Sequence, residues 1–270
     1  MGTVMNFRQN FRLTASFGKV SLSAAAASAA FVPFAGPTLA QGAPPTWTGV
    51  YVGGQLGWVG SRSVTSVFVS GYSSGFGQAR NRLNGPAIGI YYGYNRQYGS
   101  LVAGFEGDIN ARFGSSRASL GLPGLGKVNG LAGGSALPIR VNNEWETSLR
   151  ARLGFLATQR LLIFGTAGVS WADFTFSHLG PTPGFPAAAS SAINRLSGIR
   201  SGFVFGGGFE YAMNENWHAK IEALHTIYRT KSTGASAGED NYLFRSKVKS
   251  TTIRIGISHR FGTGGGSALP

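Results

Sequence analysis

The stretch EWETSLRARLGFL, residues 144–156, shows most clearly the pattern that decides the fold. Every second side chain from Trp145 to Phe155 is apolar or small, apart from one threonine, whereas Glu146, Arg150 and Arg152 lie at the intervening positions. Successive side chains of a β-strand point to opposite faces, so a period of two predicts a strand with one apolar and one polar face.

Seven further segments repeat this alternation. Long and short gaps alternate between the eight segments. Bacterial outer-membrane barrels combine an even number of strands with short periplasmic turns and long external loops. The sequence therefore predicts an all-β fold, an eight-stranded antiparallel up-and-down transmembrane β-barrel with four long external loops and three short periplasmic turns. The predicted strands are Trp47–Val59, Pro86–Asn95, Ser100–Phe113, Glu144–Leu156, Leu161–Phe176, Gly202–Met213, Asn216–Arg229 and Ser250–Phe261. The long gaps are 60–85, 114–143, 177–201 and 230–249, and the short ones are 96–99, 157–160 and 214–215.

The charges on the polar faces indicate which face points inward. A soluble antiparallel sheet would bury the apolar face, and the alternation alone leaves that possibility open. Five acids and six bases on the polar faces nearly cancel, as a filled lumen requires, because buried charges must be paired. Eight strands enclose an interior just wide enough for side chains, so no open pore is expected. The predicted lumen charge network comprises Glu106, Asp108, Arg112, Glu146, Arg150, Arg152, Glu210, Lys220, Glu222, Arg254 and Arg260.

The tryptophans also favour a membrane barrel. All five lie at ends of predicted strands, two at the short-turn end and three at the long-gap end. Tryptophan prefers the interface between membrane and water, so this placement predicts two aromatic girdles. Aromatic side chains that plug the ends of a soluble barrel are the alternative. The predicted girdle residues are Trp47, Trp58, Trp145, Trp171 and Trp217.

The N-terminus has the pattern of an export signal. Arg8, Arg12 and Lys19 precede an alanine-rich apolar stretch over 20–35, and a small-residue cleavage site ends at Ala40. We predict a signal peptide over 1–40, an integral outer-membrane barrel over 41–261 and a short tail over 262–270. The alternative is an N-terminal arm of a cytosolic protein. The chain has no cysteine, which excludes disulfides, thiol catalysis and cysteine-bound metals.

Several segments resemble a known family. They are similar to the small outer-membrane β-barrel family of alphaproteobacteria. The segments are WTGVYVGGQLGW (47–58), VAGFEGDINARF (102–113), the pair of strands over 145–174, the unit over 203–226 and TTIRIGISHRFG (251–262). That family comprises porin-like surface proteins and antigens, some of them haemin-binding. The resemblance extends over all eight predicted strands and avoids the long gaps. It implies an outer-membrane barrel with a structural or surface role rather than a known reaction.

The last predicted strand resembles the signal that the barrel-assembly machinery reads. That signal has a polar residue, a glycine, an aromatic residue near the end and a terminal aromatic residue, and it implies this machinery as a partner during biogenesis. His259 replaces one aromatic residue, and nine residues follow Phe261, which is usually last. The matching positions are Arg254, Gly256, His259 and Phe261.

The long gaps hold most of the positive charge, with twelve Lys or Arg against Glu239 and Asp240 alone. Their Gly, Ser and Ala content predicts loops without a packed core of their own. A ring of positively charged loops would favour binding of outer-membrane lipid and lipopolysaccharide phosphates, an anionic polysaccharide or an acidic partner. The alternative is a surface whose charge only keeps the loops soluble. Nucleic acid is not an expected partner of an exported chain.

Catalytic and metal-binding signals are weak. None of the four histidines is spaced as in a zinc motif. A lipid-modifying barrel enzyme would need Ser, His and an acid near one rim, and the plentiful serines make chance combinations common. We expect no enzyme activity and no cofactor. Two alternative functions stay open: a small-solute porin-like channel, and a haemin or host-ligand receptor whose site lies in the basic loops.

Overall fold

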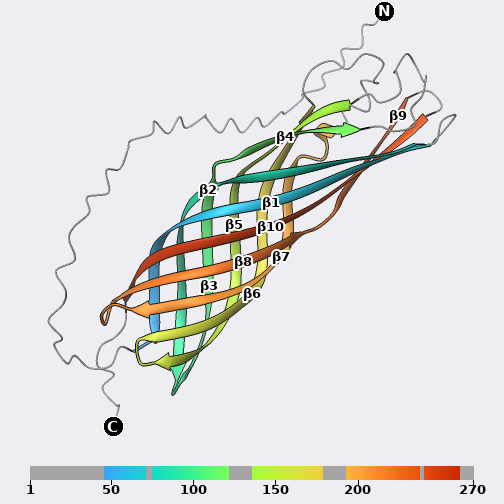
Figure 1. The fold of residues 1–270 in the computed structure, drawn as a ribbon. Coiled ribbons are helices and arrows are strands. Elements are labelled where there is room, and N and C mark those ends of the chain that lie inside the picture. Colours follow the sequence, from blue (N-terminus) through green and yellow to red (C-terminus); the bar gives the residue numbers. More distant parts are fainter. Residues whose placement is uncertain (1–45, 71–74, 122–135, 179–192, 238–239, 262–270) are drawn as a thin grey trace, which may run out of the picture. The chain divides into compact units, whose positions relative to one another are not determined.

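The computed structural model describes residues 46–70, 75–121, 136–178, 193–237 and 240–261. The predicted signal peptide and the C-terminal tail lie outside these residues and stay predictions. Strands make up almost all of the described chain (Figure 1). No helix among the described residues is long and apolar enough to cross a membrane.

Antiparallel pairings join the strands into a closed ring in the order β1–β2–β3–β5–β6–β7–β8–β10, with β10 paired to β1 again. The ring has eight members, which confirms the predicted up-and-down barrel. The bounds are β1 Gly49–Ser70, β2 Gly75–Tyr98, β3 Leu101–Arg112, β4 Ser115–Gly121, β5 Ala136–Thr158, β6 Leu161–His178, β7 Gly198–Ala212, β8 Trp217–Tyr228, β9 Lys231–Ala237 and β10 Asp240–Phe261.

Strand β4 continues the position of β3 in the ring and β9 continues that of β8, so neither adds a ninth or tenth position. β3 pairs with β5 as far as Ala111, and β4 takes over the pairing with β5 from Ser115. In the same way, β8 pairs with the second half of β10 and β9 pairs with its first half. Both lie at the same end of the barrel (Figure 1).

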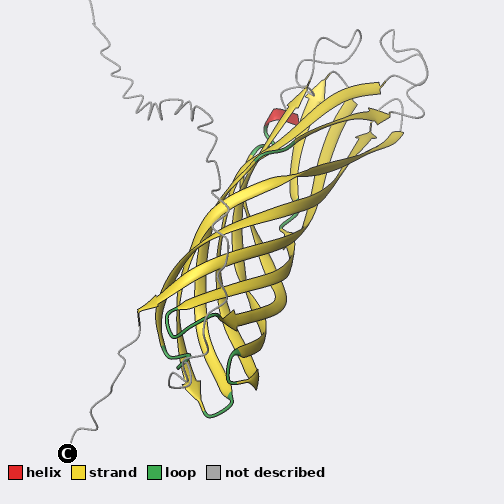
Figure 2. Cartoon of the chain, turned by 60° about the vertical axis from the view of Figure 1, so that its left-hand side comes forward, coloured by secondary structure: helices red, strands yellow, loops and turns green. Residues whose placement is uncertain are grey.

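The three short connections lie where the sequence predicts them. They comprise residues 99–100, 159–160 and 213–216, and Figure 2 shows turns gathered at one end of the barrel. The long gaps, in contrast, are wrong as loops over much of their length. The described parts of the second gap lie mainly on β4 and β5, and the first and last gaps are almost entirely strand. β1 and β10 continue through them and remain paired as far as Ser70 and Asn241, and β2 begins at Gly75. Only 71–74 and 238–239 of these two gaps lie outside the described residues.

The polarity of the two faces reverses along β10. On β10 the exposed side chains are Ile253, Ile255 and Ile257 in one half and Lys247 and Lys249 in the other. The inward side chains change in the opposite sense, from Arg254 to Val248 and Phe244. A wall that is apolar outside suits lipid, whereas a wall that is polar outside with an apolar interior suits water. The reversal therefore marks the edge of the bilayer.

Outward side chains of four neighbouring strands form the last apolar row before this edge. Trp58 pairs with Ile253 on one side and Pro86 on the other, and the Phe113 amide donates to the Pro86 carbonyl oxygen over 3.0 Å. The next outward row contains Gly60, Thr251 and Asn84. On β6 the same change occurs between Trp171 and Asp173. We call the part of the barrel between the short turns and the row of Trp58 the membrane segment. We call the part beyond Gly60 the outer extension.

The outer extension has a packed core of its own, contrary to the prediction of unpacked loops. Its buried residues, which we call the upper core, are Val67, Val69, Ala79, Leu83, Ile139, Val141, Ala172, Phe174, Phe176, Ile193, Leu196, Tyr228, Tyr242, Phe244 and Val248. They come from strands and from a short turn over 193–197. The Arg195 guanidinium bridges that turn to β9 by donating to the Gly234 carbonyl oxygen over 2.9 Å.

Candidate functional site: a filled lumen and a basic outer wall

Arg150 on β5 is the centre of the lumen charge network, and its side chain is completely buried. Its Nη2 lies 2.6 Å from Glu106 Oε1 and 2.9 Å from Asp108 Oδ2, and its Nη1 lies 3.1 Å from Glu222 Oε2. The three carboxylates belong to β3 and β8, so one guanidinium joins opposite walls of the barrel. Bidentate and multiple contacts of this kind are the strong, geometrically specific ion pairs.

Two further cations complete the centre. The Arg254 Nη1 atom lies 3.1 Å from Asp108 Oδ2, and Lys220 Nζ lies 2.6 Å from Glu106 Oε1. Lys220 Nζ also lies 3.6 Å from the centre of the Tyr91 ring. Each central carboxylate thus faces at least two cations, as burial of charge requires.

The remaining predicted network residues lie toward the two ends of the membrane segment. Arg112 pairs with Glu146, and Arg152 pairs with Glu210. Arg260 is different: it donates to the backbone oxygen of Glu215, and among the described residues it forms no ion pair. Its place near the end of β10, beside the β7–β8 turn, explains why a carbonyl group replaces a carboxylate.

Tyrosine and glycine pairs fill the space beside the charges. Tyr51 on β1 is paired with Gly93 on β2, and Gly53 with Tyr91. A Cβ atom at Gly53 would come within 2.6 Å of Tyr91 Cζ, so only glycine lets this ring lie flat against the wall. The Tyr51 hydroxyl donates to Glu106 Oε2 over 3.0 Å. These two buried tyrosines were not among the predicted lumen residues.

Trp47 is a correction to the predicted girdles. It is only 1% exposed and packs with Val102, Leu162 and Phe164 inside the short-turn end of the barrel. Trp47 precedes β1, so strand parity does not direct its side chain, and its indole nitrogen donates to the Gln159 carbonyl oxygen. Trp47 therefore fills this end of the barrel instead of belonging to a girdle.

The other four tryptophans point outward. Trp58, Trp171 and Trp217 are well exposed, and Trp145 is partly exposed. Trp145 and Trp171 lie close together on neighbouring strands, because Trp171 pairs with Thr147, two residues after Trp145 on β5. On the other side of β5, Thr147 pairs with Ile109 and Trp145 pairs with Ala111. These positions are compatible with girdles at the two edges of the membrane segment.

The upper core closes the outer extension and contains one buried cation that the sequence did not suggest. Arg200 is 3% exposed and donates to the carbonyl oxygens of Ser246 and Leu196, each over 3.1 Å. Its guanidinium carbon lies 4.9 Å from the centre of the Phe176 ring. Among the residues that the structure describes, no carboxylate pairs with it, so carbonyl oxygens and aromatic faces stabilise the charge.

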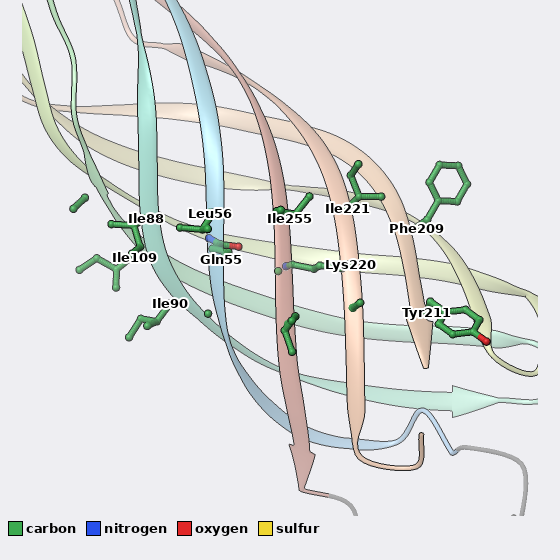
Figure 3. A pocket seen from close by; sticks show the side chains of 16 residues that line it. Gln55, Leu56, Ile88, Ile90, Ile109, Phe209, Tyr211, Lys220, Ile221 and Ile255 are labelled. Atoms are coloured by element: carbon green, nitrogen blue, oxygen red, sulfur yellow. The ribbon is translucent and has the colours of Figure 1, made fainter. Parts of the chain in front are cut away.

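The outer face of the membrane segment is apolar over neighbouring strands (Figure 3). Leu56, Ile88 and Ile255 are each at least half exposed, while Gln55 and Lys220, whose side chains alternate with them, are buried. The face continues with Ile90, Ile109, Phe209, Tyr211 and Ile221. Exposure of this much apolar surface fits contact with lipid chains.

The residues that resemble the insertion signal extend from the centre of the membrane segment to the short-turn end of β10. Arg254 and Gly256 face inward, and Phe261 is exposed on the outer face. His259 lies between Trp217 and Phe261, with ring centres 5.0 and 4.8 Å away, so it takes the place of the expected aromatic residue in an aromatic cluster.

The basic residues of the predicted loops are mostly on strands. Arg62, Arg80 and Arg82 lie on β1 and β2, and Arg245, Lys247 and Lys249 lie on β10. Lys127 lies outside the described residues. The described part of the chain contains no cluster of three or more His, Cys, Asp or Glu side chains that could hold a metal ion. The positive charge thus forms a wall rather than a ring of loops.

Comparison with known proteins agrees with this geometry. The family model described as "Outer membrane protein beta-barrel domain" matches residues 6–261. The chain belongs to this family. Members of this outer-membrane β-barrel family lie in a lipid and lipopolysaccharide environment, and the barrel has a structural or surface role there.

Two curated relatives span most of the chain. The 31 kDa outer-membrane immunogenic protein of Brucella melitensis is 29% identical over 256 residues, which is 89% of this chain and 96% of the relative. The 22 kDa outer membrane protein of Rhizobium leguminosarum is 23% identical and covers 82% of this chain and 83% of its own. The crystal structure of OprG from Pseudomonas aeruginosa aligns with a TM-score of 0.45 at 11% identity, over 82% of this chain and 100% of that one.

Proposed function

We propose that this protein is a sealed, non-enzymatic surface barrel whose lumen is closed in three tiers. The first tier is the cluster around Trp47 at the short-turn end, the second is the lumen charge network, and the third is the upper core. Each tier joins strands from different sides of the ring, so together they make the wall rigid as well as closed.

The completely buried Arg150 carries this proposal. Its contacts with Glu106, Asp108 and Glu222 join opposite walls of the membrane segment across the lumen. An ion crossing the barrel would have to break these pairs, and removing one partner of a buried pair is strongly unfavourable. A small-solute channel is therefore not favoured. A receptor site in basic loops is not favoured either, because the basic residues concerned lie on the strands of a packed extension.

The proposal includes export and assembly. We propose that residues 1–40 are removed during export and that the barrel-assembly machinery reads the end of β10 at Phe261. The curated Brucella relatives are named immunogenic outer-membrane proteins. We propose that the outer extension of this chain is exposed at the cell surface and is likewise immunogenic.

Planar bilayers test the sealed lumen. The purified, refolded protein should produce no stable conductance steps, because side chains fill the lumen from Trp47 to Phe244. A general diffusion porin reconstituted in the same way is the positive control, and a heat-denatured sample is the negative one. Reproducible, stable openings of the folded protein would refute the proposal and favour the channel.

A further inference from the structure

Basic side chains stand in a row across the outer wall, just above the apolar membrane segment. Arg62 on β1 is paired directly with Lys249 on β10 and with Arg82 on β2, and Arg117 on β4 is paired with Arg140 on β5. All five lie on the outer face. We call them the basic row.

The two parts of the row meet between β2 and β4. The β2–β3 pair Ala87–Arg112 and the β2–β4 pair Gln78–Gly121 keep the same register. That register places Arg117 at the position opposite Arg82. Neighbouring strands lie about 4.8 Å apart, so a row over five strands spans about 19 Å.

The row is electrostatically unfavourable by itself. Like charges directly opposite each other on neighbouring strands destabilise a sheet. In the part of the chain that the structure describes, all ion pairs lie in the lumen, and none includes a residue of the row. Arg80, Lys247 and Arg245 add further positive charge on the same side of the row. An external anion would remove this repulsion.

The position of the row indicates which anion is present. Arg62 follows Trp58 by four residues on β1, which is about 13 Å along a strand. Strand tilt reduces this to about 10 Å of height above the last apolar row. Charged lipid headgroups lie at this level, with their chains against the apolar wall below.

A hollow in the wall adds a binding surface. It has a volume of about 870 Å³ and is lined by Arg62, Arg82 and Lys249, together with the small or polar residues Gly60 and Thr251. The guanidinium group presents a planar fork of donors that fits phosphate oxygens.

We propose that the basic row binds the phosphate groups of the phosphorylated glycolipid headgroup in the outer leaflet, the lipid A part of lipopolysaccharide. The length of the row allows more than one phosphate to be bound at once. The acyl chains then lie against the apolar residues below Trp58. This site lies on the outside of the barrel and does not depend on whether the lumen conducts.

Binding of defined lipids to the detergent-folded chain tests the site. The probes are diphosphorylated lipid A, the same lipid A without its phosphates, phosphatidylglycerol and inorganic phosphate. The variants are R62Q/R82Q and, as a control, R96Q/R160Q, which removes two arginines at the short-turn end. Loss of charge-assisted hydrogen bonds should weaken lipid A binding about tenfold or more in R62Q/R82Q and less than about twofold in the control.

The probes separate the possible sources of the anion. The native protein should bind diphosphorylated lipid A more tightly than the phosphate-free form and more tightly than phosphatidylglycerol. Equal binding of the phosphate-free form, equal binding of phosphatidylglycerol, displacement of lipid A by millimolar inorganic phosphate, or equal losses in the two variants would each overturn the assignment.

Thermal stability gives a second readout that a merely structural role would not produce. Without lipid, R62Q/R82Q should melt at a temperature equal to or higher than that of the native protein, because repulsion is relieved. With saturating diphosphorylated lipid A, the native protein should gain more stability than the variant, because ligand binding stabilises the folded state. A variant that melts lower in lipid-free detergent would contradict the proposal.

Discussion

Replacing Arg150 with methionine is expected to lower the free energy of unfolding by roughly 3–5 kcal/mol, because it leaves buried carboxylates without their common partner. Glu106 would then keep only Lys220 and the more distant Arg152. Glu222 would keep Lys220 and Arg254 at longer range, and Asp108 would keep Arg254. Methionine retains much of the side-chain volume, so the effect reports charge rather than a cavity. Urea unfolding in lipid vesicles, followed by tryptophan fluorescence, measures the change.

Two further variants make this test specific. Arg96→Met removes an exposed arginine near the end of β2 and should change stability by less than about 0.5 kcal/mol. Adding Glu222→Gln to the Arg150→Met protein should restore part of the loss, because one uncompensated charge disappears. An Arg150→Met protein as stable as the Arg96→Met control would show that the network does not hold the strands together.

Replacing Ile255 with arginine should destabilise the barrel by about 2–4 kcal/mol, the cost of a cation on the lipid face near the bilayer midplane. Ile255 is 57% exposed and is paired with Leu56 and Ile221, which are also apolar and exposed. In a soluble barrel an exposed isoleucine could become arginine at little cost. Unfolding in vesicles of uniform lipid thickness measures the difference.

The matched control lies on the same kind of wall beyond the bilayer edge. Thr175 on β6 is partly exposed, two residues past Asp173, so Thr175→Arg should change stability by less than about 0.5 kcal/mol. Similar losses for both variants, or no loss for either, would be incompatible with lipid contact limited to the membrane segment.

Strand parity made the membrane segment predictable from the sequence. Arg150 and Arg152 lie between apolar residues, and a charge in that pattern can only face a lumen once the apolar side faces lipid. The same reasoning predicted Glu106 on β3 and Glu222 on β8, which lie far apart in the sequence. The three-dimensional pairing of these charges, with Arg150 as the centre, needed the strand register.

The outer extension was not predictable in the same way because its polarity is reversed. Phe244 and Val248 alternate with Lys247 and Lys249 just as inward and outward residues do in a soluble sheet, but the serines of β1 and the glycines of β2 resemble a loop. Trp47 was misplaced because it precedes the first strand. Alternation of opposite phase is visible on β10 from Tyr242 to Lys249, whereas on β1 the buried Ser61, Ser63 and Thr65 hide it.

The position of the bilayer edge tests the central claim most directly. The chain has no native cysteine, so single cysteines at outward positions of β1 can carry spin labels in lipid vesicles. Labels at 52, 54 and 56 should be accessible to oxygen dissolved in lipid, and labels at 62, 64 and 66 to a water-soluble relaxation agent, with the change between Trp58 and Arg62. A label at 66 with lipid accessibility, or a label at 54 exposed to water, would contradict a wall whose polarity reverses at this edge.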